Sequence, residues 1–126
     1  GLVPPAPLFL ARAVAARGVA ELEPVEPVEH GVVAAATVLA WTELAAYTAV
    51  YAPAGVRQPI AHVWWRDGGR LARVALPTPV MGGRREGFRT FSRFTDLKPP
   101  VAGRYRVDVV TASGQLIGRL RFTVTP

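Results

Sequence analysis

The chain has 126 residues, no cysteine and a formal net charge of +6. Its length suits one domain with a single hydrophobic core, and the absence of cysteine excludes a disulfide framework, a thiolate metal site and a cysteine nucleophile. Two arginines and five glutamates give residues 1–56 a charge of −3, whereas 13 basic and four acidic residues give residues 57–126 a charge of +9.

The first thirty residues are rich in proline. Residues 3–8 contain three prolines, which favour an extended tether. Residues 9–17 fit either a short helix, because of their alanines, or an extended strand. Residues 21–29 are acidic and interrupted by proline, a pattern that indicates a linker or an edge strand. We therefore expect residues 1–30 to form a proline-rich tether or edge segment.

The domain itself is expected over residues 31–126, where short apolar runs recur. Residues 31–56 carry one charged side chain, Glu43. That glutamate in the middle of the run, and the break at residues 53–55, argue against a membrane helix. Strands over residues 32–41 and 44–51 explain the run better.

Two hairpins follow in the second part of the chain. Asp67-Gly68-Gly69 lies between apolar runs at residues 60–65 and 71–76, which predicts a hairpin turn. A further strand is expected over residues 88–94, with a loop at 96–100. Beyond it, apolar and polar residues alternate with the period of two that is typical of half-buried strands. The expected inward side chains are Tyr105, Val107, Val109, Leu116, Leu120, Phe122 and Val124, and the expected outward arginines are Arg104, Arg106, Arg119 and Arg121.

About seven short strands joined by hairpins and proline loops predict an all-β fold. We expect a two-sheet antiparallel sandwich of immunoglobulin-like topology, preceded by the extended proline-rich segment. A small β-barrel is the alternative, because the number of strands does not separate the two architectures.

Three motifs in residues 53–124 carry a family resemblance. They are a His-x-Trp strand at His62 and Trp64, an Arg-Thr-aromatic-Ser strand over residues 89–92, and a closing hairpin that begins at residues 103–109. In this order they resemble bacterial domain-of-unknown-function family 2914, although Phe91 and Tyr105 stand where that family more often has tryptophan.

The resemblance implies a cellular setting and no activity or cofactor. Members of the family are often fused behind membrane helices. A domain of the bacterial cell envelope is therefore implied, on the periplasmic or extracytoplasmic side and tethered to the membrane in the full-length protein.

Six residues are candidates for ligand binding. His62 and Trp64 share one strand face, and a neighbouring strand could align polar side chains beside them. An aromatic face beside guanidinium and hydroxyl groups suits a sugar ring or a carboxylated glycan. The alternative is that Trp64 is a core residue and His62 is its hydrogen-bonded neighbour. The candidates are His62, Trp64, Trp65, Arg89, Thr90 and Ser92.

The sequence carries no catalytic or metal-binding signature. A triad of Ser92, His62 and either Asp67 or Asp96 would lack a nucleophile elbow. The basic, glycine-rich residues 81–87 lack the ending and the following helix of a phosphate-binding loop. The two histidines do not have the spacing of a zinc site. We therefore expect a protein that is not an enzyme.

The outward arginines suggest an anionic partner. Aromatic residues do not alternate with them, which argues against nucleic acid. An anionic glycan, another anionic envelope component, another protein or the protein's own membrane domain would fit. The acidic residues 21–29 could also pack along these arginines.

The expected function is a non-enzymatic, envelope-exposed binding or interaction domain of a membrane-associated protein. A structural or assembly extension without a ligand is the alternative, and a carbohydrate-binding module is a weaker one.

Overall fold

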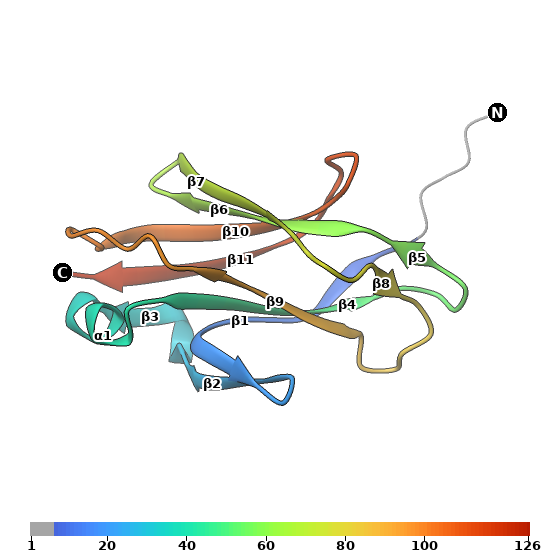
Figure 1. Cartoon of the computed structure of the whole chain (residues 1–126), viewed down its shortest axis with the longest axis horizontal. Coiled ribbons are helices and arrows are strands. Elements are labelled where there is room, and N and C mark those ends of the chain that lie inside the picture. The colour runs from blue at the N-terminus through green and yellow to red at the C-terminus, as the bar shows by residue number, and fades with distance from the viewer. Residues whose placement is uncertain (1–6) are drawn as a thin grey trace.

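The chain folds into two β-sheets stacked face to face, as the computed structural model of residues 7–126 shows (Figure 1). The four-stranded sheet has the order β2-β1-β4-β9, and the five-stranded sheet has the order β3-β11-β10-β6-β7. All strand pairs are antiparallel except β3 with β11, which is parallel. The described residues form two open sheets and no closed barrel.

The strands of the four-stranded sheet are β1 (Phe9–Ala20), β2 (Glu23–Pro27), β4 (Leu44–Tyr51) and β9 (Phe88–Phe94). Those of the five-stranded sheet are β3 (Val32–Ala34), β6 (Ile60–Arg66), β7 (Gly69–Ala75), β10 (Gly103–Thr111) and β11 (Leu116–Thr125). A small additional pair is formed by β5 (Arg57–Gln58) and β8 (Val80–Met81). The helical segments are η1 (Glu29–Gly31) and α1 (Ala35–Trp41).

The strand alternative holds for residues 9–17, which lie within β1. The alanines of β1 have helical propensity, but pairing with β4 supplies long-range hydrogen bonds and a buried face. The sandwich therefore begins at β1 and not at residue 31. The expected edge strand is β2, at the end of the sheet order, while residues 1–6 of the predicted tether lie outside the described residues.

The hairpin of β1 and β2 bends back over the outer face of the four-stranded sheet. Arg12 on β1 lies opposite Ala49 on β4, and Ala49 lies opposite Arg89 on β9, so the two arginines share a face. Glu23 of β2 forms ion pairs with both, at 3.3 Å and 3.0 Å. Tyr47 is buried, although strand alternation turns it away from the other sheet. The hairpin thus covers this outer face.

The prediction of a strand over residues 32–41 is wrong beyond its first three residues. Only β3 pairs with β11, and the chain then continues as α1. The chain has to cross here from the five-stranded to the four-stranded sheet, and alanine favours a helix for that crossing. Val38 anchors α1 in the core, and Thr42 ends it in a left-handed conformation. No helix within residues 7–126 is long and apolar enough to span a membrane.

The predicted strands from residue 44 onward are confirmed, and so is the first hairpin. Asp67 and Gly68 join β6 to β7, and both have the positive φ that such a two-residue turn requires. One inward prediction in the second hairpin fails, because Leu116 is exposed. A bulge pairs Val110 with Leu116 and reverses the alternation at that point.

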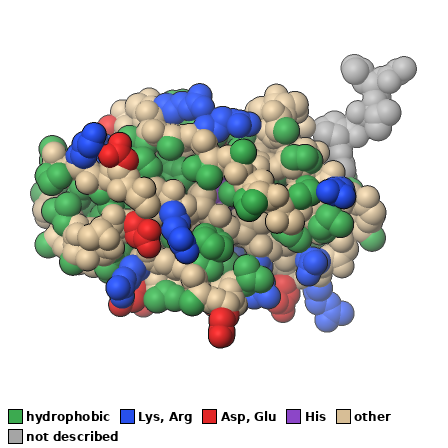
Figure 2. Space-filling model, viewed as in Figure 1, with side chains coloured by type: hydrophobic (Ala, Val, Ile, Leu, Met, Phe, Trp, Pro, Cys, Tyr) green, Lys and Arg blue, Asp and Glu red, His purple; other side chains and the backbone are tan. Residues whose placement is uncertain are grey.

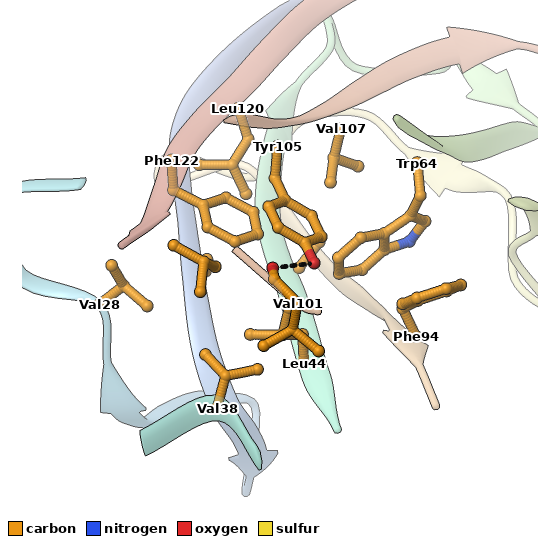
Figure 3. Packing of buried hydrophobic residues seen from close by; sticks show 13 residues of the cluster. Val28, Val38, Leu44, Trp64, Phe94, Val101, Tyr105, Val107, Leu120 and Phe122 are labelled. Carbon is orange, nitrogen blue, oxygen red and sulfur yellow. Dashed lines mark hydrogen bonds between the residues drawn. The ribbon is translucent and has the colours of Figure 1, made fainter. Parts of the chain in front are cut away.

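The core lies between the sheets and is built around aromatic side chains (Figure 3). The rings of Trp64 and Phe94 are 5.7 Å apart, and those of Tyr105 and Phe122 are 5.1 Å apart. The Tyr105 hydroxyl donates a 2.7 Å hydrogen bond to the carbonyl oxygen of Val101. This bond fixes the start of β10 against the loop before it.

Candidate functional site

A buried polar cluster joins the two sheets. Its members are one aromatic, one imidazole and three hydroxyl side chains from β4, β6 and β9, and all are buried. Ser92 Oγ lies 2.6 Å from His62 Nδ1, and it accepts a 3.0 Å hydrogen bond from Trp64 Nε1. On the other side of the imidazole, His62 Nε2 lies 3.0 Å from Thr48 Oγ1, which is 3.2 Å from Thr90 Oγ1. We call Thr48, His62, Trp64, Thr90 and Ser92 the polar cluster.

One proton arrangement gives each of these contacts a donor and an acceptor. The Trp64 N–H donates to Ser92, whose O–H donates to His62 Nδ1. His62 Nε2–H then donates to Thr48, and Thr48 donates to Thr90. This arrangement requires a neutral imidazole. Burial favours the neutral form, because it lowers the pKa of His62 from 6.5 to about 4.

The Ser92–His62 contact has the spacing of a nucleophile and its base, but the rest of a triad is missing. Asp67 accepts a hydrogen bond from the backbone N–H of Arg104, and Asp96 lies 3.6 Å from Lys98. The imidazole nitrogen that an acid would orient contacts Thr48 instead. No three histidine or carboxylate side chains come together among residues 7–126 in a way that could hold a metal ion.

Four of the six candidate residues meet in the polar cluster, and two lie elsewhere. Arg89 neighbours Thr90 on β9, so its side chain is on the opposite face, where it binds Glu23 and the carbonyl oxygen of Leu22. Trp65 likewise points away from Trp64. Thr48 is a cluster member that sequence reasoning missed. Its signal was the one threonine in a buried strand of alanine, leucine, valine and tyrosine, where its hydroxyl needs a partner.

The outer face of the five-stranded sheet carries a second group of functional side chains, which we call the basic face. Cross-strand pairing aligns Trp65 with Arg106 and Arg121, and Val63 with Asp108 and Arg119. Asp108 is the one acidic residue of these rows and is 8% exposed. Arg106 and Arg119 lie over it, with Nε to Oδ1 distances of 3.0 Å and 3.1 Å. By the basic face we mean five of the arginines on this side, namely Arg73, Arg104, Arg106, Arg119 and Arg121. Arg70, which pairs with Trp65 beyond a bulge in β7, adjoins them at the edge of the sheet.

The four predicted outward arginines therefore share one face, with Arg73 as an addition. The expectation that residues 21–29 pack along them is wrong. Glu23 and Glu26 form ion pairs with arginines of the four-stranded sheet, because β2 pairs with β1 in that layer. In Figure 2, Lys and Arg side chains gather along the upper edge over β6 and β7, whereas acidic and basic side chains mix along the lower edge near β2.

A hollow of about 590 Å³ opens on the basic face beside the turn between β6 and β7. We call it the arginine hollow. The Arg106 guanidinium lies over the Trp65 ring, 4.9 Å from its centroid. Trp65 Nε1 and Arg106 Nε are buried and have no hydrogen-bond acceptor among the described residues. The hollow is lined by Trp65, Asp67, Gly68, Arg104, Tyr105, Arg106 and Arg121.

Comparison of the sequence with known protein families gives a family for the chain. No curated protein was found to match the sequence. A family model described as "Protein of unknown function (DUF2914)" matches residues 57–124. That segment contains β6, β7, β9, β10 and nearly all of β11, and with them four of the five members of the polar cluster and all five arginines of the basic face. Because the match covers more than half of the 126 residues, the chain belongs to the DUF2914 family.

Proposed function

We propose that the chain is a non-enzymatic binding domain of the bacterial cell envelope, held on the extracytoplasmic side by a membrane-associated parent protein. It binds an anionic envelope component through the basic face. The observation that supports this proposal is the difference between the two outer faces of the sandwich. The β1–β2 hairpin covers one face and its glutamates pair with the arginines there. The other face carries five arginines and Asp108.

The charges of the basic face are only partly balanced. Asp108 pairs with Arg106 and Arg119, while Arg73, Arg104 and Arg121 have no ion-pair partner within residues 7–126. Arginine side chains bind carboxylate and phosphate groups through two parallel hydrogen bonds. An anionic partner would therefore add favourable contacts without breaking existing ones.

Removing the three unpaired arginines should weaken binding to anionic surfaces. We expect the triple variant Arg73→Gln, Arg104→Gln and Arg121→Gln to bind phosphatidylglycerol vesicles or an acidic polysaccharide about tenfold or more weakly than the unchanged protein. The binding of the unchanged protein should also fall with added salt. Cosedimentation with vesicles and a polysaccharide binding assay measure both effects.

A second triple variant removes the same charge from another surface. Arg57, Arg84 and Arg85 are exposed and lie outside the basic face, so their change to Gln should leave binding nearly intact. Equal weakening in the two triple variants would show that net charge alone is responsible and would refute the proposal.

A structural or assembly extension without a ligand is the second candidate. The polar cluster favours it, because Trp64 and His62 are fully buried and their hydrogen bonds bind one sheet to the other. Absence of any anionic binding by the unchanged protein would support this candidate. Carbohydrate binding by ring stacking is weaker, since Arg106 already covers one face of Trp65.

We also infer that the topology is immunoglobulin-like. Support comes from the strand order, in which β1, β4 and β9 correspond to strands A, B and E, and β11, β10, β6 and β7 correspond to G, F, C and C′. Trp64 is buried on the strand that corresponds to C. Tyr105, near the start of the strand that corresponds to F, bonds to the backbone four residues upstream, as a tyrosine corner does. Superposition of an experimental structure on immunoglobulin-like domains tests this inference.

A further inference from the structure

We infer that the arginine hollow is a discrete binding site for a compact oxyanion, namely a carboxylate, phosphate or sulfate group of a soluble ligand. This inference rests on the proposed function and narrows it from a charged face to one site. The site residues are Trp65, Arg104, Arg106 and Arg121.

Hydrogen-bond donors outnumber acceptors among the side chains of the hollow, where three arginines and one tryptophan stand against one carboxylate. Arg104 and Arg121 are exposed, and neither has an ion-pair partner within residues 7–126. Guanidinium groups and the indole N–H can only donate. The carboxylate in the lining, Asp67, already accepts from the backbone N–H of Arg104 at 2.9 Å. A ligand that supplies only acceptors complements such a set, and an oxyanion is that kind of ligand.

The two unsatisfied donors independently mark the same place. Buried polar atoms nearly always have a hydrogen-bond partner, so each exception calls for an explanation. Among the described residues, two buried side-chain atoms have no hydrogen-bond partner, namely Trp65 Nε1 and Arg106 Nε. Both residues line this hollow. Arg106 Nε lies 3.0 Å from Asp108 Oδ1, but in an ion pair without hydrogen-bond geometry. An oxyanion bound in the hollow would supply the acceptor that Trp65 Nε1 lacks.

The shape of the site favours a small ligand group over an extended surface. The hollow volume of about 590 Å³ falls within the range of small-molecule sites. The Arg106 guanidinium lies over the Trp65 ring, so an oxyanion that binds Arg106 also lies beside the indole. A flat bilayer can contact the rim arginines, but it cannot reach a buried N–H of the sheet face.

The indole N–H signals of the tryptophans provide the test. The chain has three tryptophans. The indole N–H of Trp64 donates to Ser92 inside the core, so the Trp64 signal serves as an internal reference. We expect titration with inorganic phosphate, sulfate or galacturonate, at constant ionic strength, to shift the Trp65 signal in nitrogen–proton NMR spectra until it saturates. The Trp64 signal should stay in place, and Trp65→Phe assigns the shifting signal. Absence of a saturable shift with all three probes would overturn the inference.

Two charge variants and one control locate the site. Arg104→Gln and Arg121→Gln should each raise the dissociation constant about tenfold. Arg57→Gln removes the same charge from an exposed position outside the basic face and the hollow, and it should change the constant less than about twofold. Equal weakening in all three variants would indicate diffuse attraction and would refute a discrete site.

Vesicle binding separates this inference from the proposed function. Binding to phosphatidylglycerol vesicles or acidic polysaccharide without a Trp65 shift would refute the oxyanion site and leave the basic face as a contact surface. A saturable Trp65 shift without either kind of binding would support the site and refute the contact with extended anionic surfaces.

Discussion

Ser92→Ala is expected to lower the free energy of unfolding by about 2–4 kcal/mol, because its hydroxyl serves two buried partners. Ser92 Oγ accepts from Trp64 Nε1 and lies 2.6 Å from His62 Nδ1. Alanine leaves the indole N–H of Trp64 and Nδ1 of His62 without this partner inside the core. For a domain of this size the loss corresponds to a fall in melting temperature of roughly 10 °C.

Urea denaturation of the variant and a matched control measures this effect. Ser113→Ala also removes a hydroxyl, but from an exposed turn where its contact is Thr111 Oγ1, and it should cost less than about 0.5 kcal/mol. A loss for Ser92→Ala no larger than that of the control would contradict the proposed role of the polar cluster.

Acidification should destabilise the protein by about 3 kcal/mol between pH 6.5 and pH 4 through His62 alone. Burial lowers the pKa of His62 from 6.5 to about 4 in the folded state, so the unfolded chain takes up the proton first. The contribution of His62 is therefore fully favourable above pH 6.5 and declines as the pH falls. Below about pH 4 both states carry the proton, and the contribution levels off.

The two histidines allow a controlled measurement. His62→Gln should flatten this part of the stability profile whatever its stability at neutral pH, because glutamine does not titrate. His30→Gln, at an exposed position, is the matched control for the loss of an imidazole. Urea denaturation at several pH values gives the profiles, and NMR titration of the His62 ring gives its pKa directly. A ring that titrates near pH 6.5 would disprove this explanation.

The parts of the fold that the sequence predicted are those in which local pattern and burial agree. Alternation over residues 104–109, together with the Asp67-Gly68 turn, was sufficient for β10, β6 and β7. β1 was ambiguous, since its alanines favour a helix and only the distant strand β4 makes the extended form preferable. α1 was missed because the chain crosses there from one sheet to the other. Such a crossing is a property of the topology, and it produces no helical period in an apolar run of sequence.

The candidate site was predictable to the extent that strand alternation determines it. His62 and Trp64 on β6, and Thr90 and Ser92 on β9, each lie two residues apart, and so they face one side. Which side faces the other sheet depends on packing that the sequence does not encode locally. Arg89 was grouped with these residues although it directly precedes Thr90, so strand alternation turns its side chain to the opposite face.

The basic face was predicted for β10 and β11, where charge alternates with apolar residues. Arg73 was missed because it joins that face only through pairing of β7 with β6. The hairpin that covers the opposite sheet was also outside the reach of local patterns. Its glutamates find Arg12 and Arg89 through a bend of the whole β1–β2 unit.

The parallel pairing of β3 with β11 affects how the domain folds. β11 lies between β10 and β3, so the sheet that carries the arginine hollow joins residue 32 to residue 123. Contacts between positions so far apart in sequence slow folding. The five-stranded sheet therefore cannot be completed until β11, the last strand of the chain order, takes its place between β10 and β3, and until then the aromatic residues of β10 lack their β11 neighbours.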